Sequence, residues 1–462
     1  MTDLKDVTLL IPLRVDSEER VSNLDALLEY LCRGAELQVL IMEADEVPRY
    51  FPKKKYPHVG YWFVKDTDPV FYRTYYLNRL LEKVQTPFAG IWDTDVIVSF
   101  RQIADAVSAL RKGEAVMSIP YDGRVYAVPP LYSKEFRQSL DFDFLDRHIS
   151  DSVLLLGNLS VGGAILVNKE TYWKAGGENE HFYGWGPEDF ERVKRMEKLH
   201  LPVYRSPGPL FHLYHPVGIN SQYASQALER RNQAELFAID KMDREALLDD
   251  IRTWRDPGEV LQRIADYLLA HAYSSQDIGL FYGVAGWILF FFHYARYSKK
   301  TYYEDFAGDL LDFLYARLDP ELSLSFESGL CGIGWAMEYL VQSGFMRGDT
   351  SLLLREFDEK VMEWDPAKIK DLSLETGLLG IFQYVEARAR SARQNNKPFP
   401  FDSVYYSKLR ERAACNEWEI PQGVRPVLDD LLNKVRMERN TREWKSGLKE
   451  GCAGYGLKLL LT

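Results

Sequence analysis

The chain has 462 residues, and a chain of this length is expected to form two domains rather than one core. Hydrophobic residues make up 46% of it and charged residues 27%, which is typical of a globular protein. The formal net charge of −11 argues against a nucleic-acid partner, because phosphate backbones attract clustered lysine and arginine.

The four cysteines are widely spaced and form no CxxC pair, which argues against a disulfide framework and for a reducing compartment. No signal peptide precedes the first predicted strand. The most apolar stretch, at residues 287–292, is too short to cross a bilayer. We therefore expect a cytoplasmic protein without a membrane span.

Residues 1–220 alternate short apolar runs with helical patterns, which predicts a Rossmann-like α/β domain. The predicted strands cover residues 7–12, 38–43, 61–64, 88–93, 116–120 and 164–167. The predicted helices cover residues 23–32 and 71–84. The sheet should be mostly parallel with helices on both faces. Ligands of such sheets bind at the carboxyl ends of the strands, where Arg14, Asp93 and Asp95 fall.

Residues 221–257 are polar and helical, and we expect a connecting helix there. Beyond it, residues 258–462 show long helical patterns and a repeated glycine signature, at residues 279–286, 329–335, 377–381 and 451–456. The first three copies recur roughly every 48 residues, and each opens an apolar helix, which indicates stacked helical hairpins. The small residues would let the inner helices crowd around a common axis.

The segment 182–189, Phe-Tyr-Gly-Trp-Gly-Pro-Glu-Asp, is the most informative stretch. Glycines flank Trp185 and allow tight bends, and Pro187 precedes two adjacent carboxylates, Glu188 and Asp189, at a predicted helix start. An aromatic ring beside two acids suits a sugar, which stacks on the ring and donates its hydroxyls to the carboxylates. The alternative is an ordinary helix N-terminus with favourable acids in its first turn.

Two further patterns could hold a metal ion. Asp93 and Asp95 follow an apolar strand, and hard oxygen ligands facing a diphosphate suit Mg²⁺ or Mn²⁺. His212 and His215 lie three residues apart and could face one metal together with Asp95. Two aspartates with two histidines would also suit a zinc hydrolase. The glycines 162 and 163 before a strand indicate close backbone approach or a bulge.

With these motifs in order, residues 7–216 resemble the GT-A glycosyltransferases of the galactosyltransferase group, which includes β-1,4-galactosyltransferases and bacterial chondroitin polymerases. Residues 11–14 resemble that group's IPFR strand end, and residues 71–78 its FNRAxLLN helix. Residues 93–95 correspond to its DxD, residues 161–189 to its GGxxA…GG…GWGxED stretch, and residues 212–215 to its later metal-ligand pair. Phe190 departs from the pattern, since it replaces a third acid and leaves acceptor specificity open.

The resemblance implies a GT-A fold for residues 1–220 and a role for each matched residue. The implied metal ligands, for Mn²⁺ or Mg²⁺, are Asp95, His212 and His215. The implied catalytic residues are Asp189, as general base of an inverting reaction, and Glu188. In a retaining reaction, Asp189 would only orient the sugar. The implied substrate-binding residues are Pro12, Arg14, Phe71, Arg73, Asp93, Gly163 and Trp185.

Residues 258–462 resemble, less closely, the α/α-toroid domains of lanthionine synthetase C-like proteins through their glycine repeats. The cyclases of that family hold zinc through WCYG and CHG motifs, and neither is present. Tyr282 stands at the position of a frequent histidine, and no histidine follows Cys331 or Cys452, so we interpret both thiols as core residues. The segment should be an all-α partial toroid. It would serve either as a scaffold or as an acceptor-binding module, and whether the chain forms a homo-oligomer through it is an open question.

These patterns lead to one main hypothesis and two alternatives. The main hypothesis is a metal-dependent hexosyltransferase that moves a sugar of the galactose, N-acetylgalactosamine or glucose type from a UDP-sugar to a glycan or peptide acceptor. One alternative is a non-catalytic protein that binds nucleotide-sugars or peptides. The other is a peptide-modifying enzyme centred on the helical segment.

Overall fold

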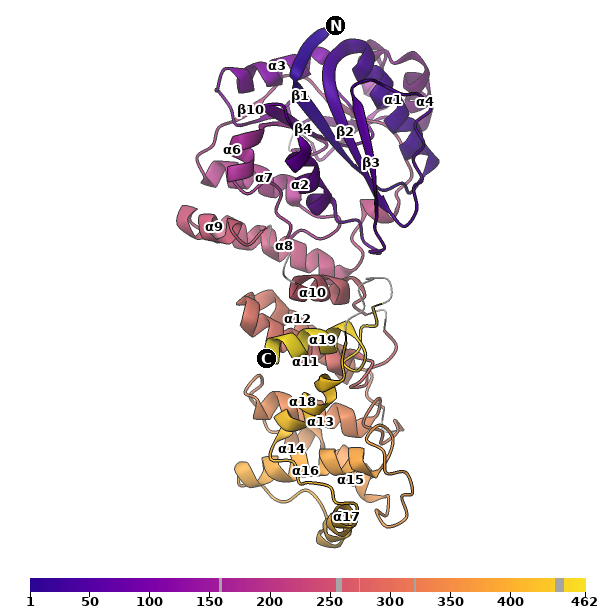
Figure 1. Cartoon of the computed structure of the whole chain (residues 1–462), viewed down its shortest axis with the longest axis vertical. Coiled ribbons are helices and arrows are strands. Elements are labelled where there is room, and N and C mark those ends of the chain that lie inside the picture. Colours follow the sequence, from indigo (N-terminus) through magenta and orange to yellow (C-terminus); the bar gives the residue numbers. More distant parts are fainter. Residues whose placement is uncertain (158–159, 255–259, 274, 320, 437–443) are drawn as a thin grey trace. The chain divides into compact units, whose positions relative to one another are not determined.

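The structure of the chain is a computed structural model (Figure 1), which describes residues 1–157, 160–254, 260–273, 275–319, 321–436 and 444–462. The chain divides into two compact units, Met1–Pro257 and Gly258–Thr462. The division falls at residues 255–259, outside the described residues. The segment expected to form one connecting helix contains two, α8 (Gln226–Lys241) and α9 (Arg244–Ile251), and both belong to the first unit.

The first unit is built on a seven-stranded sheet with the order β10-β6-β9-β4-β1-β2-β3. Its strands are β1 (Thr2–Leu13), β2 (Ala35–Asp45), β3 (Val59–Lys65), β4 (Phe88–Trp92), β6 (Met117–Ile119), β9 (Ala164–Asn168) and β10 (Val203–Arg205). The pairs β1·β2, β1·β4, β2·β3 and β6·β10 are parallel, as the alternation of strands and helices predicted. Strand β9 runs antiparallel to both of its neighbours, so the sheet is mixed.

Besides α8 and α9, the described residues of this unit form a further set of helices, and four of them begin at a capping side chain. The helices of this set are α1 (Glu18–Gly34), α2 (Arg73–Lys83), α3 (Phe100–Arg111), α4 (Pro130–Ser139), α5 (Phe142–Arg147), α6 (Lys169–Lys174) and α7 (Glu188–Lys198), with short 3-10 turns at Ile149–Asp151 and Ile219–Ser221. The Ser17 side chain accepts a hydrogen bond at the start of α1, and Ser99 forms a capping box with Gln102 in α3. In Figure 1, α1 and α4 lie to one side of β1–β3, and α6 and α7 to the other.

A second, four-stranded sheet lies in the same unit, and no sequence pattern predicted it. Its order is β5-β11-β7-β8. Its strands are β5 (Val96–Ile97), β7 (Val125–Ala127), β8 (Val153–Leu155) and β11 (Leu210–His212). Strands of two or three residues are too short to display the two-residue alternation by which a strand is recognised.

Among the described residues of the second unit, every regular element is a helix. Its helices are α10 (Val260–Ala270), α11 (Val284–Ser298), α12 (Thr301–Tyr315), α13 (Leu330–Gln342), α14 (Thr350–Leu353), α15 (Arg355–Met362), α16 (Leu378–Gln394), α17 (Ser403–Cys415), α18 (Val424–Asn433) and α19 (Cys452–Leu461). Within the described ranges, no helix is both long enough and apolar enough to cross a membrane. Cys331 and Cys452 are buried free thiols, and burial raises the pKa of each, in keeping with core residues.

Each copy of the glycine signature does open an apolar helix, since Gly283, Gly329, Gly377 and Gly451 are the N-caps of α11, α13, α16 and α19. Glycine is required by close packing: a Cβ at Gly329 would lie 2.0 Å from the carbonyl oxygen six residues earlier, and one at Gly283 would lie 2.4 Å from the equivalent oxygen. The repeated sequence thus reflects a repeated local fold.

Consecutive glycine loops are joined through the residue two positions before each N-cap. The Lys449 amide donates to the Phe281 carbonyl, the Phe281 amide to the Glu327 carbonyl, and the Glu327 amide to the Glu375 carbonyl. The Glu375 carboxylate and the Lys449 ammonium form an ion pair at 2.6 Å. The four loops are therefore linked in a circle, while the assignment to a toroid family stays a prediction.

Candidate active site

A cavity of about 620 Å³ opens at the carboxyl ends of β1 and β4, and this volume is within the range of small-molecule sites. All of the predicted site residues line it. They are Pro12, Arg14, Phe71, Arg73, Asp93, Asp95, Gly163, Trp185, Glu188, Asp189, His212 and His215. Residues from six separate segments of the chain thus meet at one place.

The mixed sheet explains this convergence. Strands β1 and β4 are parallel and end at the same edge, whereas β9 is antiparallel and begins there, with Ala164 paired to Trp92. The Asp93 amide donates to the Gly163 carbonyl at 2.9 Å. Gly163 has a φ of +82°, which favours glycine, so the predicted close approach before this strand is real.

Asp95, His212 and His215 form a candidate metal centre. The His212 Nε2 lies 3.5 Å from Asp95 Oδ1, and the His215 Nε2 lies 3.3 Å from Asp95 Oδ2. One potential ligand atom from each residue lies within 4.8 Å of the others. Arg20 also reaches Asp95, at 3.2 Å between Nη1 and Oδ2. One carboxylate with two imidazoles suits a first-row divalent ion such as Mn²⁺ or Zn²⁺, whereas Mg²⁺ favours an all-oxygen set.

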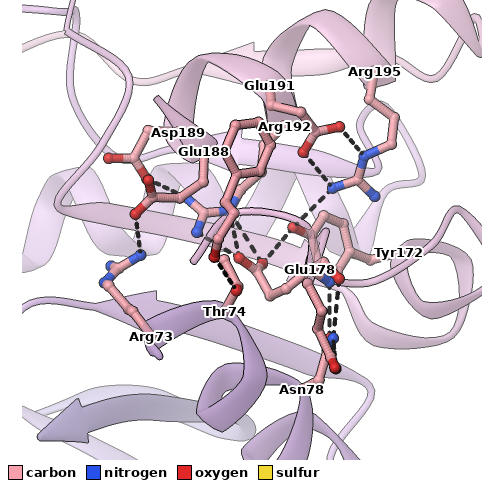
Figure 2. Close-up of polar contacts among 12 residues, drawn as sticks. Arg73, Thr74, Asn78, Tyr172, Glu178, Glu188, Asp189, Glu191, Arg192 and Arg195 are labelled. Atoms are coloured by element: carbon pink, nitrogen blue, oxygen red, sulfur yellow. Dashed lines mark hydrogen bonds and ion pairs between the residues drawn. The ribbon is translucent and has the colours of Figure 1, made fainter. Parts of the chain in front are cut away.

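Asp93 does not join this cluster. Its Oδ1 lies 2.7 Å from Arg73 Nη2, and Arg73 Nη1 lies 3.3 Å from Glu188 Oε1 (Figure 2). Burial disfavours the guanidinium charge, but the carboxylates of Asp93 and Asp189 outweigh it and raise the pKa of Arg73. The two aspartates of one short motif thus have different partners, and Asp93 does not complete a set of two aspartates and two histidines with the candidate metal centre.

Glu188 is the first residue of α7 and is almost fully buried, at 5% exposure. Its Oε2 has no hydrogen-bond partner among the described residues. Burial, together with the charge of the neighbouring Asp189, raises the pKa of Glu188 to about 8. The raised pKa favours the protonated, neutral form of this carboxyl group.

Asp189 lies against two very different neighbours. Its Oδ1 accepts a hydrogen bond from Arg192, one turn along α7 (Figure 2). Its Oδ2 faces the backbone of Gly162, where an added Cβ would lie only 1.9 Å away. The helix start predicted from sequence thus aims Asp189 at the glycine pair, and Gly162 provides the room.

A buried polar network supports the start of α7 from below (Figure 2). Arg192 Nη2 donates to Glu178 Oε2 at 2.5 Å, and the Tyr172 hydroxyl donates to Glu178 Oε1 at 2.7 Å. Burial opposes the charge of Arg192, but Glu178 and Asp189 raise its pKa. Because these charges are paired and buried, they fix the position of Asp189. No sequence pattern pointed to these supporting residues.

Trp185 is half-exposed, at 48%, on the wall of the cavity. The Asn232 side chain of α8 donates to the Trp185 carbonyl at 3.1 Å and to the Tyr183 carbonyl at 3.2 Å. The Tyr223 ring meets the indole edge-to-face, with centroids 4.8 Å apart. The segment expected to be only a connector therefore helps to shape the site.

The Arg14 guanidinium forms hydrogen bonds mainly with other residues of the chain. Its guanidinium donates to the Ala44 carbonyl at 2.8 Å, to the Asp68 carbonyl at 2.9 Å and to Asp66 Oδ2 at 2.6 Å. It also lies over the Phe71 ring, 5.2 Å from its centroid. These contacts make Arg14 and Phe71 a fixed wall of the cavity, so neither needs to move to meet a ligand.

Sequence reasoning missed Arg20, although Asp16 four residues before it indicates a helical ion pair, which is present at 2.8 Å. It also missed two apolar residues of the cavity lining, Leu155 and Leu156. Neither has a local signal, because both depend on the small second sheet.

Comparison with known proteins gives one family match. Residues 156–216 match the family described as the N-terminal domain of galactosyltransferase, and this stretch includes Gly163, Trp185, Glu188, Asp189 and both histidines of the candidate metal centre. No curated protein matches the chain.

Among solved structures, two of a Drosophila β-1,4-galactosyltransferase 7 align with 45% of this chain and 65% of their own. One, a mutant with manganese, UDP-Gal and xylobiose, has 15% identity and a TM-score of 0.27, and the other, with xylobiose, has 16% and 0.24. GalNAc-T7 with UDP, GalNAc and Mn²⁺ aligns with 46% of this chain and 44% of its own, at 11% identity and a TM-score of 0.31. The family match at residues 156–216 identifies a galactosyltransferase-type segment around the candidate site.

Proposed function

We propose that the first unit is a metal-dependent glycosyltransferase of the GT-A type, which moves a hexose from a UDP-sugar to a hydroxyl group. One observation carries the proposal: the candidate metal centre, the buried acid Glu188 and the half-exposed Trp185 line one cavity with Asp189. The segment that matches the galactosyltransferase family contains Trp185, Glu188 and Asp189. It also contains both histidines of the candidate metal centre.

The residues present fit Mn²⁺, which Asp95, His212 and His215 would hold. When bound, such an ion neutralises the charge of a diphosphate leaving group. Arg73 adds a fixed positive charge to the same cavity, held between Asp93 and Glu188. The combination suits a substrate whose leaving group carries two phosphates.

Asp189 would take the proton of the acceptor hydroxyl. In that step the hydroxyl oxygen forms a bond to the anomeric carbon, the bond from this carbon to the diphosphate oxygen breaks, and the electron pair leaves with UDP. The Arg192 contact holds one oxygen of Asp189 and leaves the other, beside Gly162, to accept the proton. A positioned base of this kind contributes about 10²–10⁴-fold to the rate.

The experiment measures release of UDP from UDP-Gal, UDP-GalNAc and UDP-Glc by the full chain with Mn²⁺. We expect turnover of at least one donor, its loss in Asp95→Ala, and no change in Asp249→Asn, which removes an exposed carboxylate of the same unit. Asp189→Asn should lose turnover but keep the thermal stabilisation by UDP and Mn²⁺, because a bound ligand stabilises the fold by RT ln(1 + [L]/Kd). Absence of turnover and stabilisation with all three donors would refute the proposal.

A further inference from the structure

The outer edge of the small sheet is unusually apolar. Strand β8 is the last strand in its order, and it pairs only with β7 among the described strands. Val153, Leu154, Leu155 and Leu156 are 64%, 41%, 37% and 69% exposed. Natural edge strands are commonly protected by charges, proline or bulges, because an open edge invites another strand. This edge has no charged or polar side chain over four consecutive residues.

The exposed edge continues into the candidate active site. Leu155 and Leu156 line the cavity, as does Val125 of the neighbouring strand β7. Two further exposed apolar side chains line it, Trp185 at 48% and Phe190 at 43%. Phe190 directly follows the proposed base Asp189. An apolar surface therefore leads from the sheet edge to the residues that would receive an acceptor.

We propose that the acceptor is an extended polypeptide segment, which adds to the outer edge of β8 as a further strand and presents a serine or threonine hydroxyl to Asp189. This proposal rests on the proposed function, because it names the acceptor of the same reaction. The hydroxyl oxygen bonds to the anomeric carbon of the donor, UDP leaves with the electron pair of the broken bond, and the proton passes to Asp189.

The chemistry of the edge favours a polypeptide over a glycan. The outer edge of a strand offers main-chain N–H and C=O groups, and only another main chain matches them in register. Alternate residues of such a strand point to opposite faces, and both faces of β8 are apolar and exposed, so apolar side chains beside the hydroxyl residue would be buried on binding. A glycan would need polar side chains, which β8 lacks.

The test uses a pool of short peptides in which threonine alternates with valine, isoleucine or leucine, incubated with the full chain, UDP and Mn²⁺. Peptides retained by the protein are identified and then tested as acceptors with the donor that is turned over. We expect retained peptides to accept sugar at threonine. We also expect them to slow hydrogen exchange at the amides of residues 153–155, because strand addition protects edge amides.

Two variants separate the docking edge from the donor site. Leu154→Asp places a charge on the edge at a residue outside the cavity lining, and we expect the peptide KM to rise by about tenfold or more. UDP with Mn²⁺ should still stabilise this variant, which shows a folded donor site. Leu352→Asp, at an 80% exposed leucine of the helical unit, is the matched control and should leave the peptide KM unchanged.

Three results would overturn the inference. In the first, UDP-sugars are turned over and a glycan such as xylobiose accepts the sugar, while no peptide of the pool is retained or modified; the proposed function then stands alone. In the second, residues 153–155 are protected without peptide in a concentration-dependent manner that Leu154→Asp abolishes, which would assign the edge to a second copy of the chain. In the third, no UDP-sugar binds or reacts, and the proposed function fails as well.

Discussion

The buried carboxyl group of Glu188 allows a quantitative prediction. It is 5% exposed, its Oε2 has no partner among the described residues, and its pKa is raised to about 8 by burial and by Asp189. Glu188→Gln keeps the shape and a hydrogen-bond donor at this position but removes the titration. Arg73 retains its 2.7 Å contact with Asp93, so the substitution strands no cation.

The sign of the effect follows from proton binding. Between the ordinary pKa of 4.5 and the raised value of about 8, the folded state holds this proton and the unfolded state does not. The free energy of unfolding therefore falls as pH rises through this interval and is constant, with respect to Glu188, outside it. At 1.36 kcal/mol per pH unit, the interval amounts to roughly 4–5 kcal/mol. As pH rises from 4.5 to 9, the free energy of unfolding of Glu188→Gln should therefore increase relative to that of wild type by most of this amount.

The assay is urea unfolding of wild type and Glu188→Gln across this pH range. Unfolding is monitored by hydrogen exchange of peptides from α7. Exchange at α7 reports on the first unit, because α7 lies within Met1–Pro257. Glu36→Gln, which removes an exposed carboxylate of the first unit, is the control and should follow wild type. A difference between Glu188→Gln and wild type that does not change with pH would refute the reasoning.

Three further substitutions probe contacts around the site and in the helical unit. Gly162→Ala would place a Cβ 1.9 Å from the Asp189 carboxylate, so we expect transfer to fall by about 10²-fold or more with UDP binding retained; unchanged transfer would argue against the base role. Asn232→Ala removes both hydrogen bonds to the loop of Trp185, and unfolding of the first unit should become easier by about 1–3 kcal/mol in urea. Arg388→Met leaves two buried carboxylates of the helical unit without their cation, and should cost about 3–5 kcal/mol there; a neutral result would show that water reaches them.

The parts of the site that the sequence predicted are those with a local signal. The strand ending at Trp92, the acids after it and the helix beginning at Glu188 each depend on a few neighbouring residues. The meeting of the residues after β1 and β4 follows from a rule about parallel strands, since both strands end at the same edge. The helix start at Glu188 was placed beside them only by the resemblance to a known family.

The antiparallel direction of β9 and the second sheet lacked such a signal. A single strand of five residues reads the same in either direction, and its direction is set by the chain that surrounds it. The strands of the second sheet have two or three residues, and each is stabilised by partners far away in sequence, such as Val125 beside Leu155. The apolar residues that this sheet contributes to the cavity lining could not be predicted from the sequence for the same reason.

The roles within the DxD motif also depend on distant partners. Asp93 and Asp95 differ in sequence only by position, so both were expected to face a diphosphate or its metal. In the fold, Asp95 meets two histidines that lie more than a hundred residues later, whereas Asp93 meets Arg73, which also contacts Glu188. One aspartate therefore belongs to the candidate metal centre, and the other is paired with Arg73. This division follows from the side chains that the fold brings to each carboxylate, and those side chains lie outside the motif itself.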